Sequence, residues 1–222
     1  MRALVLLSGG LDSAVCALLA LREGRQVSAL TIRYGQRHGV ETKKASVLGR
    51  QLGLNPHLFM DLPPELFVGS ALTDAAVPVP LDRPLDDAIP STYVPSRNLV
   101  FLSLAAAAAE GRGAEEIWIG VNALDYSGYP DCRPEFIEAF ARVLEVGTKA
   151  GTQGHAVKIR APLLQMNKAA IIRLGLDLGL DFTLTSSCYA PTPDGIPCRR
   201  CDACQLRARG FAGAGLADPL MG

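Results

Sequence analysis

The segment ALVLLSGGLDSAVCALLALREG, residues 3–24, decides the fold class of this chain. Its first five residues are uniformly apolar, which is typical of a strand buried on both faces of a parallel sheet. After a glycine turn, Leu11, Val15 and Leu18 recur at helical spacing, and Gly24 marks the end of the predicted helix. A buried strand followed by an amphipathic helix is the first unit of an α/β fold.

The same alternation continues along the chain. Apolar runs and helical spacing predict strands at residues 27–32, 57–61, 116–121 and 157–160, and helices at residues 40–52, 98–110, 134–146 and 167–178. A proline-rich loop at residues 63–95 interrupts the pattern, and a loop of that length in a compact domain is usually functional. Repeated strand and helix units predict an open parallel sheet with helices on both faces, whose ligands bind at the carboxyl ends of the strands.

The length and charge of the chain limit its domain organisation and its partners. A chain of 222 residues suits one large catalytic body with a small appendage. We expect an α/β domain at residues 1–183 and a cysteine-containing segment packed on it at residues 184–222. Lys and Arg total 22, as do Asp and Glu, so the chain lacks the positive field that attracts polyanions and a nucleic-acid partner is disfavoured.

Export and membrane insertion are not indicated by the sequence. The apolar residues 3–7 are too few for the core of a signal peptide. The apolar helical stretch at residues 99–109 is about half of the roughly 20 residues that a membrane span requires. We therefore expect a cytoplasmic protein with no membrane partner.

The glycine turn between the first strand and helix is a candidate phosphate site. Its glycines let backbone N–H groups approach an anion, the helix N-terminus adds a favourable dipole, and two serine hydroxyls add donors. The predicted nucleotide-binding residues are Leu7, Ser8, Gly9, Gly10, Leu11, Asp12, Ser13 and Ala14. The turn lacks the lysine of the GxxxxGK[ST] loop, so a different cleavage of ATP is expected. The alternative is a plain Ser/Gly turn in which Asp12 is only a helix N-terminal charge.

Four of the six cysteines form a candidate zinc site. Cys198, Cys201 and Cys204 follow one another at CxxC spacing, and Cys188 lies ten residues upstream across a proline-containing loop. Four thiolates close a tetrahedral shell and leave no position for water, so the predicted zinc ion is structural. The alternative is a set of redox-active or unrelated thiols.

The two remaining cysteines have different expected roles. Cys16 falls within the first predicted helix, where a small core residue is expected. Cys132 lies in a loop beside prolines and could be reactive, but catalysis by it is the minor interpretation.

Several longer strings in the sequence point to one enzyme family. The turn SGGLDS, residues 8–13, resembles that of the ATP pyrophosphatase (PP-loop) superfamily. Further strings are YGQRH at residues 34–38, YVPSRN at 93–98, DYSGYPDCRPE at 125–135 and SCY at 187–189. Together they resemble the 7-cyano-7-deazaguanine synthase family of queuosine biosynthesis, over nearly the whole chain. Arg199 departs from the glycine expected between two of the cysteines, which affects local loop geometry and no ligand.

This resemblance implies a fold, a reaction and cofactors. The implied fold is Rossmann-like, of the adenine nucleotide α-hydrolase type, with a small C-terminal zinc-binding lobe. The implied reaction converts 7-carboxy-7-deazaguanine and ammonium to the nitrile, uses ATP with Mg²⁺, and releases AMP and pyrophosphate. A carboxylate is a poor electrophile until one oxygen becomes a leaving group, so adenylylation of the carboxylate and then of the amide is a coherent route.

Other functions stay open at the level of sequence. One alternative is a tRNA-modifying ATP pyrophosphatase, although no basic face or added RNA-binding domain is evident. A second is an amide-forming ligase that stops before the nitrile, and a third is a zinc interaction module without activity. Ammonia is expected to arrive free or from a partner protein, and a homodimer is plausible.

Four residues are the predicted catalytic set: Asp12, Ser13, Lys168 and Arg97. Asp12 and Ser13 are expected at the ATP phosphates, Asp12 through Mg²⁺ or its water shell. Lys168 follows the predicted N-cap Asn167, where a positive charge is unfavourable unless an anion compensates it. Arg97 could pair with the substrate carboxylate or a phosphate. For Lys168 an exposed position, and for Arg97 a structural ion pair, are the competing interpretations.

The groups that recognise the substrate are less defined by the sequence. A guanine-like edge offers N–H donors and needs an acidic acceptor, which could be Asp125, Asp131 or Glu135. Tyr34, Tyr126 and Tyr129 could stack on a flat heterocycle, although each is individually more typical of packing. His38 could be a base or a phosphate donor, with a structural role as the commoner alternative.

Overall fold

A single five-stranded parallel sheet organises the chain. The computed structural model describes residues 1–37, 39–86, 88–122 and 128–221. The strands are β1 (Arg2–Leu6), β2 (Gln26–Arg33), β3 (His57–Asp61), β4 (Glu116–Trp118) and β5 (Lys158–Arg160), in the order β3-β2-β1-β4-β5. All four strand pairs are parallel, which confirms the predicted sheet. The strand order reverses between the neighbouring strands β1 and β4, which is where parallel sheets bind their ligands.

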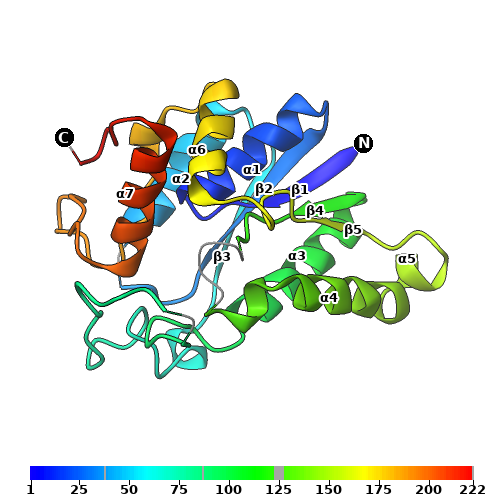
Figure 1. Ribbon diagram of the computed structural model, residues 1–222. Helices are drawn as coiled ribbons and strands as arrows, with labels where there is room; N and C mark the ends of the chain where they lie inside the picture. Colours follow the sequence, from blue (N-terminus) through cyan, green and yellow to red (C-terminus); the bar gives the residue numbers. More distant parts are fainter. Residues whose placement is uncertain (38, 87, 123–127, 222) are drawn as a thin grey trace.

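Helices cover both faces of the sheet (Figure 1). The α-helices are α1 (Leu11–Arg22), α2 (Val40–Gln51), α3 (Arg97–Arg112), α4 (Pro134–Gly147), α5 (Lys149–Thr152), α6 (Lys168–Asp177) and α7 (Asp202–Ala214). Helices α1, α2, α6 and α7 lie on one side, and α3 and α4 lie on the other (Figure 1). Within the described residues, no helix combines the length and apolar character needed to cross a bilayer.

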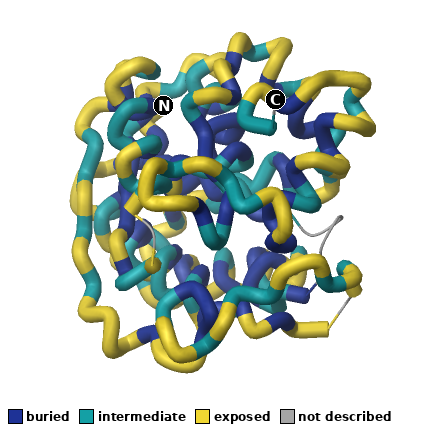
Figure 2. Tube along the Cα trace, turned by 90° about the vertical axis from the view of Figure 1, so that its left-hand side faces the viewer, coloured by how far each residue is buried: buried dark blue, intermediate teal, exposed yellow. Residues whose placement is uncertain are grey.

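Alternating strand residues supply the two halves of the core. Ala3 and Val5 pack with α1 and α6, whereas Leu4 and Leu6 pack with α3 and α4. Side chains of a strand point alternately to its two faces, so the unbroken apolar run of β1 serves both layers. Buried residues run through the middle of the trace and exposed residues lie at its periphery (Figure 2).

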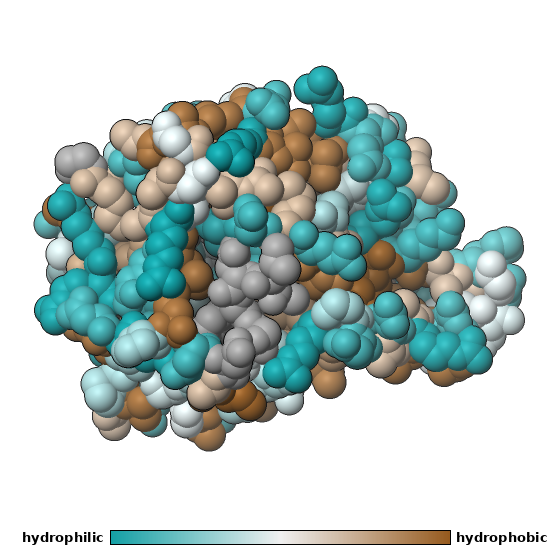
Figure 3. Space-filling view, viewed as in Figure 1, coloured by the Kyte–Doolittle hydropathy of each residue, from teal (hydrophilic) through white to brown (hydrophobic). Residues whose placement is uncertain are grey.

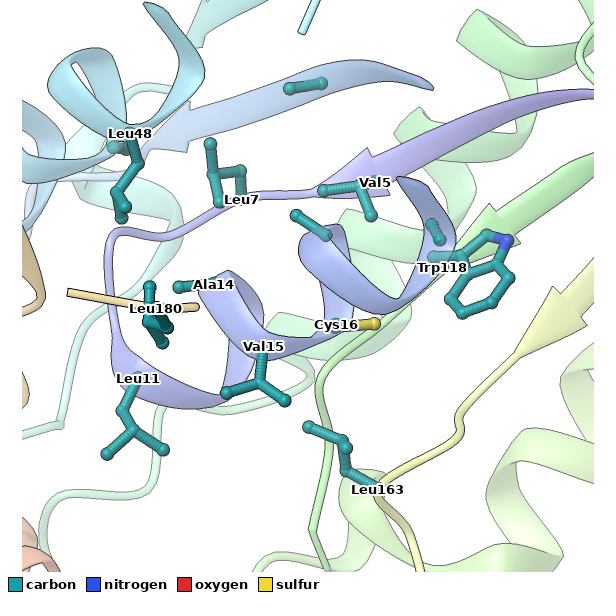
Figure 4. Packing of buried hydrophobic residues seen from close by; sticks show 14 of the residues in the cluster. Val5, Leu7, Leu11, Ala14, Val15, Cys16, Leu48, Trp118, Leu163 and Leu180 are labelled. Carbon is teal, nitrogen blue, oxygen red and sulfur yellow. The ribbon is translucent and has the colours of Figure 1, made fainter. Parts of the chain in front are cut away.

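Cys16 is a core residue, as predicted. It lies on α1 close to Val15 and Trp118 in the cluster between α1 and the sheet (Figure 4). Burial raises the pKa of its thiol well above the ordinary value, so the sulfur is protonated and inert.

The structure differs from the predicted elements in three places. Strand β4 ends at Trp118 instead of residue 121, although the Ile119 N–H still donates to the Arg160 carbonyl at 2.9 Å before the chain leaves the sheet. Helices α5 and α7 were not predicted. Helix α5 is a single turn, and α7 is rich in Arg, Gly and Ala and lacks a clear apolar stripe.

The long loop at residues 63–95 packs on the cysteine segment. Leu81 forms an antiparallel bridge with Cys201, and the Asp82 N–H donates to the Arg200 carbonyl at 2.9 Å. Arg83 pairs with Asp202 at 2.9 Å. The two segments are therefore joined by backbone and charged contacts between residues that lie more than 100 positions apart in sequence.

Candidate active site

The turn between β1 and α1 is closed by its own serines. The Ser8 N–H donates to Ser13 Oγ at 3.2 Å, the Gly10 N–H donates to Ser8 Oγ at 3.2 Å, and Ser13 Oγ donates to the Gly10 carbonyl at 3.0 Å. Gly10 is the N-cap of α1 and has no side chain to bond the first helical turn. Among the described contacts, the N–H groups of Leu11, Asp12 and Ser13 make no hydrogen bond, which leaves them available to an anion.

Two glycines allow this turn to be approached closely. Gly9 has a φ of +89°, and a Cβ there would lie 2.1 Å from the Glu41 carbonyl oxygen in the first turn of α2. Gly120, just after β4, faces α1 in the same way, because a Cβ there would lie 2.8 Å from the Asp12 carbonyl oxygen. Glycine at both positions lets the starts of α1 and α2 and the end of β4 meet at the edge of the sheet.

A cavity of about 300 Å³ opens over this edge. Six of the eight predicted nucleotide-binding residues line it: Leu7, Ser8, Gly10, Leu11, Asp12 and Ser13. Gly9 and Ala14 do not line it. The cavity extends past the ends of β2 and β4 to the starts of α3 and α6 and to Cys188 and Tyr189 in the cysteine segment.

Lys168 reaches Asp12 across the cavity. Its Nζ lies 2.8 Å from each carboxylate oxygen of Asp12. Lys168 is the first residue of α6, and the N-cap role of Asn167 is confirmed, since its Oδ1 accepts a hydrogen bond from the Ala170 N–H at 2.8 Å. The Asp12 carboxylate compensates the unfavourable positive charge at this helix N-terminus. The pair places an ammonium group beside the turn at residues 8–13.

Arg97 enters the cavity from the start of α3. Its Nη1 donates to the Tyr34 hydroxyl at 3.4 Å, and its guanidinium lies 5.9 Å from the centre of the Tyr34 ring. Tyr34 is buried against Phe67 and Phe101 in edge-to-face contacts. Tyr129 also lines the cavity, where its hydroxyl lies 2.9 Å from Thr92 Oγ1. Arginine is always charged, so this part of the cavity combines a fixed cation with aromatic walls.

The predicted acidic acceptors are not in the described part of the cavity. The Asp131 carboxylate is buried and accepts the Asn98 N–H at 2.9 Å, which caps the start of α3. Glu135 is exposed on α4 and does not line the cavity. Asp125, Tyr126 and His38 lie outside the described residues.

The structure places a different carboxylate in the cavity. Glu41, in the first turn of α2, lines it. Burial raises the pKa of Glu41 to about 7, although the positive charge of Arg97 lowers it. Sequence reasoning missed this residue because an acidic side chain in a first helical turn is common for local reasons.

Cys132 is a protonated thiol in the cavity wall. Asn98 Nδ2 donates to its sulfur at 3.3 Å. Burial raises the pKa of Cys132 to about 12, so a thiolate nucleophile is disfavoured at neutral pH. This geometry agrees with the expectation that catalysis by Cys132 is the minor interpretation.

The four clustered cysteines form a site that could hold a metal ion. The sulfurs of Cys188, Cys198, Cys201 and Cys204 lie within 4.8 Å of one another. The Cys198 and Cys204 sulfurs are 3.9 Å apart, and a tetrahedral zinc shell with bonds of 2.3 Å has edges of about 3.8 Å. The backbone N–H groups of residues 198 and 201 donate to Cys188 Sγ at 3.1 Å and Cys198 Sγ at 3.3 Å, which stabilises thiolate charge.

Arg199 has a backbone conformation that explains why glycine suits this position. Its φ is +63°, in the left-handed region that costs a residue with a Cβ about 1–2 kcal/mol. The departure from glycine noted in the sequence therefore affects the backbone between two cysteines and leaves all four sulfurs in place.

The fold and the cavity define an α/β enzyme whose site lies at the carboxyl edge of a parallel sheet, beside a turn with available N–H groups and a cluster of cysteines that could hold a metal ion. Residues 2–215 match the family described as "Queuosine biosynthesis protein QueC". The chain belongs to this family, and the family predicted from its motifs is confirmed.

Curated relatives support the same assignment over almost the full chain. The 7-cyano-7-deazaguanine synthase of Paramagnetospirillum magneticum is 53% identical over 219 residues, which cover 98% of this chain and 96% of that protein. The enzyme of the same name from Anaeromyxobacter dehalogenans is 53% identical over 221 residues, which cover 98% and 94%.

A solved structure shows a similar fold. It is the predicted subunit of a tRNA methyltransferase from Methanocaldococcus jannaschii, with a TM-score of 0.50 and 18% identity over 79% of this chain and 74% of that one. At this identity the likeness concerns the fold alone.

Proposed function

We propose that the protein converts 7-carboxy-7-deazaguanine and ammonium to 7-cyano-7-deazaguanine, with ATP as the activating substrate. The observation that carries the proposal is the single cavity in which the turn at residues 8–13, the Lys168–Asp12 pair and Arg97 meet. The names of the relatives supply the product, and the anion-binding turn supplies a place for the phosphates of ATP.

Two rounds of activation account for the atoms of the product. A carboxylate oxygen attacks the α-phosphorus of ATP, and pyrophosphate leaves. Ammonia attacks the acyl adenylate, AMP leaves with that oxygen, and the amide forms. The amide oxygen then attacks the α-phosphorus of a second ATP, and pyrophosphate leaves again. Loss of two protons and AMP from this adduct gives the nitrile. Both oxygens of the carboxylate depart in AMP, and one cavity can serve both rounds.

Each group at the turn has a proposed role. The N–H groups of residues 11–13 hold phosphate oxygens, and the hydroxyls of Ser8 and Ser13 join them by exchanging their contacts within the turn for the phosphates. Lys168 stabilises the negative charge that builds up as pyrophosphate leaves, and Asp12 holds Lys168 in position. Asp12 also offers the carboxylate oxygens that Mg²⁺ prefers, which makes it the candidate for contact with Mg²⁺ or its water shell. Arg97 pairs with the substrate carboxylate.

The cysteine cluster is proposed to bind one structural Zn²⁺ ion. Four sulfurs with the spacing of a tetrahedral shell suit Zn²⁺, and a shell of four thiolates has no open position for water. The ion would hold the cysteine segment and the loop at residues 63–95 beside the cavity, since Cys201 forms a backbone bridge with that loop. It takes no part in the chemistry.

A defined reaction mixture tests the proposal. The purified protein is incubated with Mg-ATP, ammonium and 7-carboxy-7-deazaguanine, and AMP, pyrophosphate and heterocyclic products are quantified by mass spectrometry. Nitrile with two AMP per molecule supports the proposal. Amide alone assigns the protein as an amide-forming ligase, and no AMP above a control without the carboxylate overturns the substrate assignment.

A further inference from the structure

Two carboxylates line the described part of the cavity, Asp12 and Glu41. Both oxygens of Asp12 are engaged by Lys168 at 2.8 Å. By contrast, the Glu41 carboxylate accepts no hydrogen bond and forms no close ion pair within the part of the chain that the structure describes. Glu41 is therefore the acidic group of the cavity whose acceptor capacity is still available to a ligand.

The surroundings of Glu41 differ from those of an acidic residue that only favours the dipole of its helix. Its backbone is fixed against the anion-binding turn, since its carbonyl oxygen occupies the space beside Gly9. Its side chain is partly buried and lines the cavity, and burial raises the pKa of its carboxyl to about 7. Glu41 is partly buried, so its carboxylate has lost part of its hydration without gaining a donor from the described residues, and a ligand that supplies N–H groups replaces that hydration.

The proposed substrate supplies such donors. The pyrimidine edge of a 7-deazaguanine carries two neighbouring donors, the ring N1–H and the 2-amino group. A carboxylate has two oxygens and accepts both hydrogen bonds side by side. An adenine edge offers its amino donor beside an acceptor nitrogen, so the same carboxylate does not match it.

Arg97 supports this orientation of the substrate. It lines the same cavity, and its positive charge offsets part of the rise that burial causes in the pKa of Glu41. If Arg97 pairs with the 7-carboxylate and Glu41 accepts from the pyrimidine edge, opposite ends of one flat heterocycle are held by groups of opposite charge. The sequence candidates Asp131 and Glu135 do not provide such an acceptor.

We propose that Glu41 determines specificity for the substrate by accepting hydrogen bonds from the N1–H and 2-amino groups of 7-carboxy-7-deazaguanine. This inference rests on the proposed function. Glu41 acts in recognition and leaves the activation chemistry to the turn and Lys168. The competing role for a carboxylate in this cavity is contact with the ribose hydroxyls of ATP, and the experiment separates the two.

The test compares two substrates with two enzymes. Steady-state kcat/KM is measured for 7-carboxy-7-deazaguanine and for its analogue without the 2-amino group, using wild-type protein and the Glu41→Gln variant. We expect the wild type to lose about 10- to 100-fold in kcat/KM with the analogue, as a lost hydrogen bond to a charged group implies. Glu41→Gln is expected to lose a similar factor with the natural substrate, to discriminate less than about 5-fold between the two, and to keep the KM for ATP.

Two further variants keep the result interpretable. Glu138→Gln changes an exposed glutamate on α4 that does not line the cavity, and it is expected to retain wild-type discrimination. Glu41→Asp keeps a carboxylate, so it is expected to recover part of the discrimination, and it decides the question if Glu41→Gln does not fold. A raised KM for ATP with unchanged discrimination in the Glu41 variants places this group on ATP and overturns the inference. Absence of AMP formation by the wild type refutes the proposed function itself, before any variant is compared.

Discussion

Lys168 and Asp12 form the charged pair at the centre of the candidate site. The two side chains are 15% and 30% exposed, so water screens their attraction and the pair contributes little to stability. The pair lies beside free N–H groups of α1, where we propose that phosphate binds. A fixed positive charge at such a place accelerates a reaction because it stabilises negative charge that develops in the transition state. The pair should therefore affect catalysis much more than folding.

Replacing Lys168 with Met tests this separation. We expect kcat for pyrophosphate release to fall by about 10²- to 10³-fold, since one stabilising group for the leaving pyrophosphate is lost. The free energy of unfolding, measured in urea, is expected to change by less than about 1 kcal/mol. The matched control is Lys149→Met, which changes an exposed lysine that also begins a helix, after the capping residue Thr148. Equal losses of activity in the two variants would refute the role of Lys168.

Glu116 does not line the cavity, and its effect on the stability of the fold can be predicted. Its carboxylate accepts hydrogen bonds from Arg25 Nε at 2.8 Å and Trp118 Nε1 at 2.9 Å. Burial by itself would raise the pKa of Glu116, but these two hydrogen bonds and the charge of Arg25 hold it below its ordinary value. A lowered pKa in the folded state means that ionised Glu116 stabilises the fold above its unfolded pKa of about 4.3.

The lowered pKa of Glu116 in the folded state determines how the stability of the protein depends on pH. At pH 7 we expect Glu116→Gln to be less stable than the wild type in urea unfolding. The difference should shrink as pH falls below about 4.3 and through the lower folded pKa, because the wild-type carboxyl then becomes protonated as well. Glu115→Gln, at an exposed neighbouring position, is the control and should show a smaller difference. A Glu116→Gln difference that is constant between pH 7 and pH 3 would contradict the assigned ionisation.

At the scale of elements, the C-terminal helix depends on the cysteine cluster. Helix α7 has Cys201 as its N-cap and carries Cys204 in its first turn, so two of the four sulfurs lie at its start. The segment before it, residues 185–200, contains no α-helix or strand of its own. A bound metal ion would therefore supply much of the order of this part of the chain.

Replacing Cys201 with Ser tests the metal site. We expect the zinc content, measured by elemental mass spectrometry, to fall from about one ion per chain to nearly none. The melting temperature should fall by about 10 °C, since the cysteine segment loses its main constraint. Arg199→Gly is the control: it keeps all four sulfurs, removes a left-handed residue with a Cβ, and should retain the metal. Full zinc content in Cys201→Ser would rule out the four-sulfur site.

At the scale of the whole molecule, a buried ion pair ties the C-terminal tail to the body. Arg207 Nε lies 2.8 Å from the Asp218 carboxylate, and the side chains are 3% and 4% exposed. Arg207 also donates to Thr185 Oγ1 at 2.8 Å. Phe211 of α7 packs edge-to-face on Phe182 and belongs to the same core cluster as α1 and α6. The sequence predicted a boundary at residue 183. Because of these contacts, we expect the segments on its two sides to unfold together.

Removing one partner of this ion pair should destabilise the whole protein. Asp218→Ala leaves the Arg207 guanidinium buried without its carboxylate, which typically costs about 3–5 kcal/mol of unfolding free energy. Urea unfolding followed by both tryptophan fluorescence and circular dichroism should show one shifted transition. Glu145→Ala breaks the exposed pair with Arg142 and should cost less than about 1 kcal/mol. Separate transitions for the tail and the body would show that the segments are independent.

The remaining expectations for the whole molecule are still predictions. The face shown in Figure 3 is a mixture of hydrophilic and hydrophobic residues. The expected lack of a nucleic-acid partner, the cytoplasmic location and the possible homodimer are untested.

Local patterns in the sequence were enough to determine the fold class and two candidate sites. The apolar run of β1, the glycine turn and the helical spacing of α1 all lie within residues 2–22, where the hydrogen bonds and glycine conformations depend on near neighbours. The cysteine cluster is equally local, since three of its four members lie at positions 198–204. Short-range periodicity and spacing can be read without knowing which distant segments meet.

Only the tertiary structure decided which distant groups face one another in the cavity. Lys168 pairs with Asp12 across 156 positions, and Glu41 enters the cavity because Gly9 lets α2 approach the turn. In sequence, Glu41 is one acidic residue in a first helical turn, while Asp131 stood out within a family-specific string but caps α3 instead. Helix α7 packs closely on α6 through glycines, since a Cβ at Gly210 would lie 2.8 Å from Ile172 Cδ1, and glycines contribute no apolar stripe to the sequence. Such contacts arise from the packing of whole elements, and no local pattern in the chain encodes them.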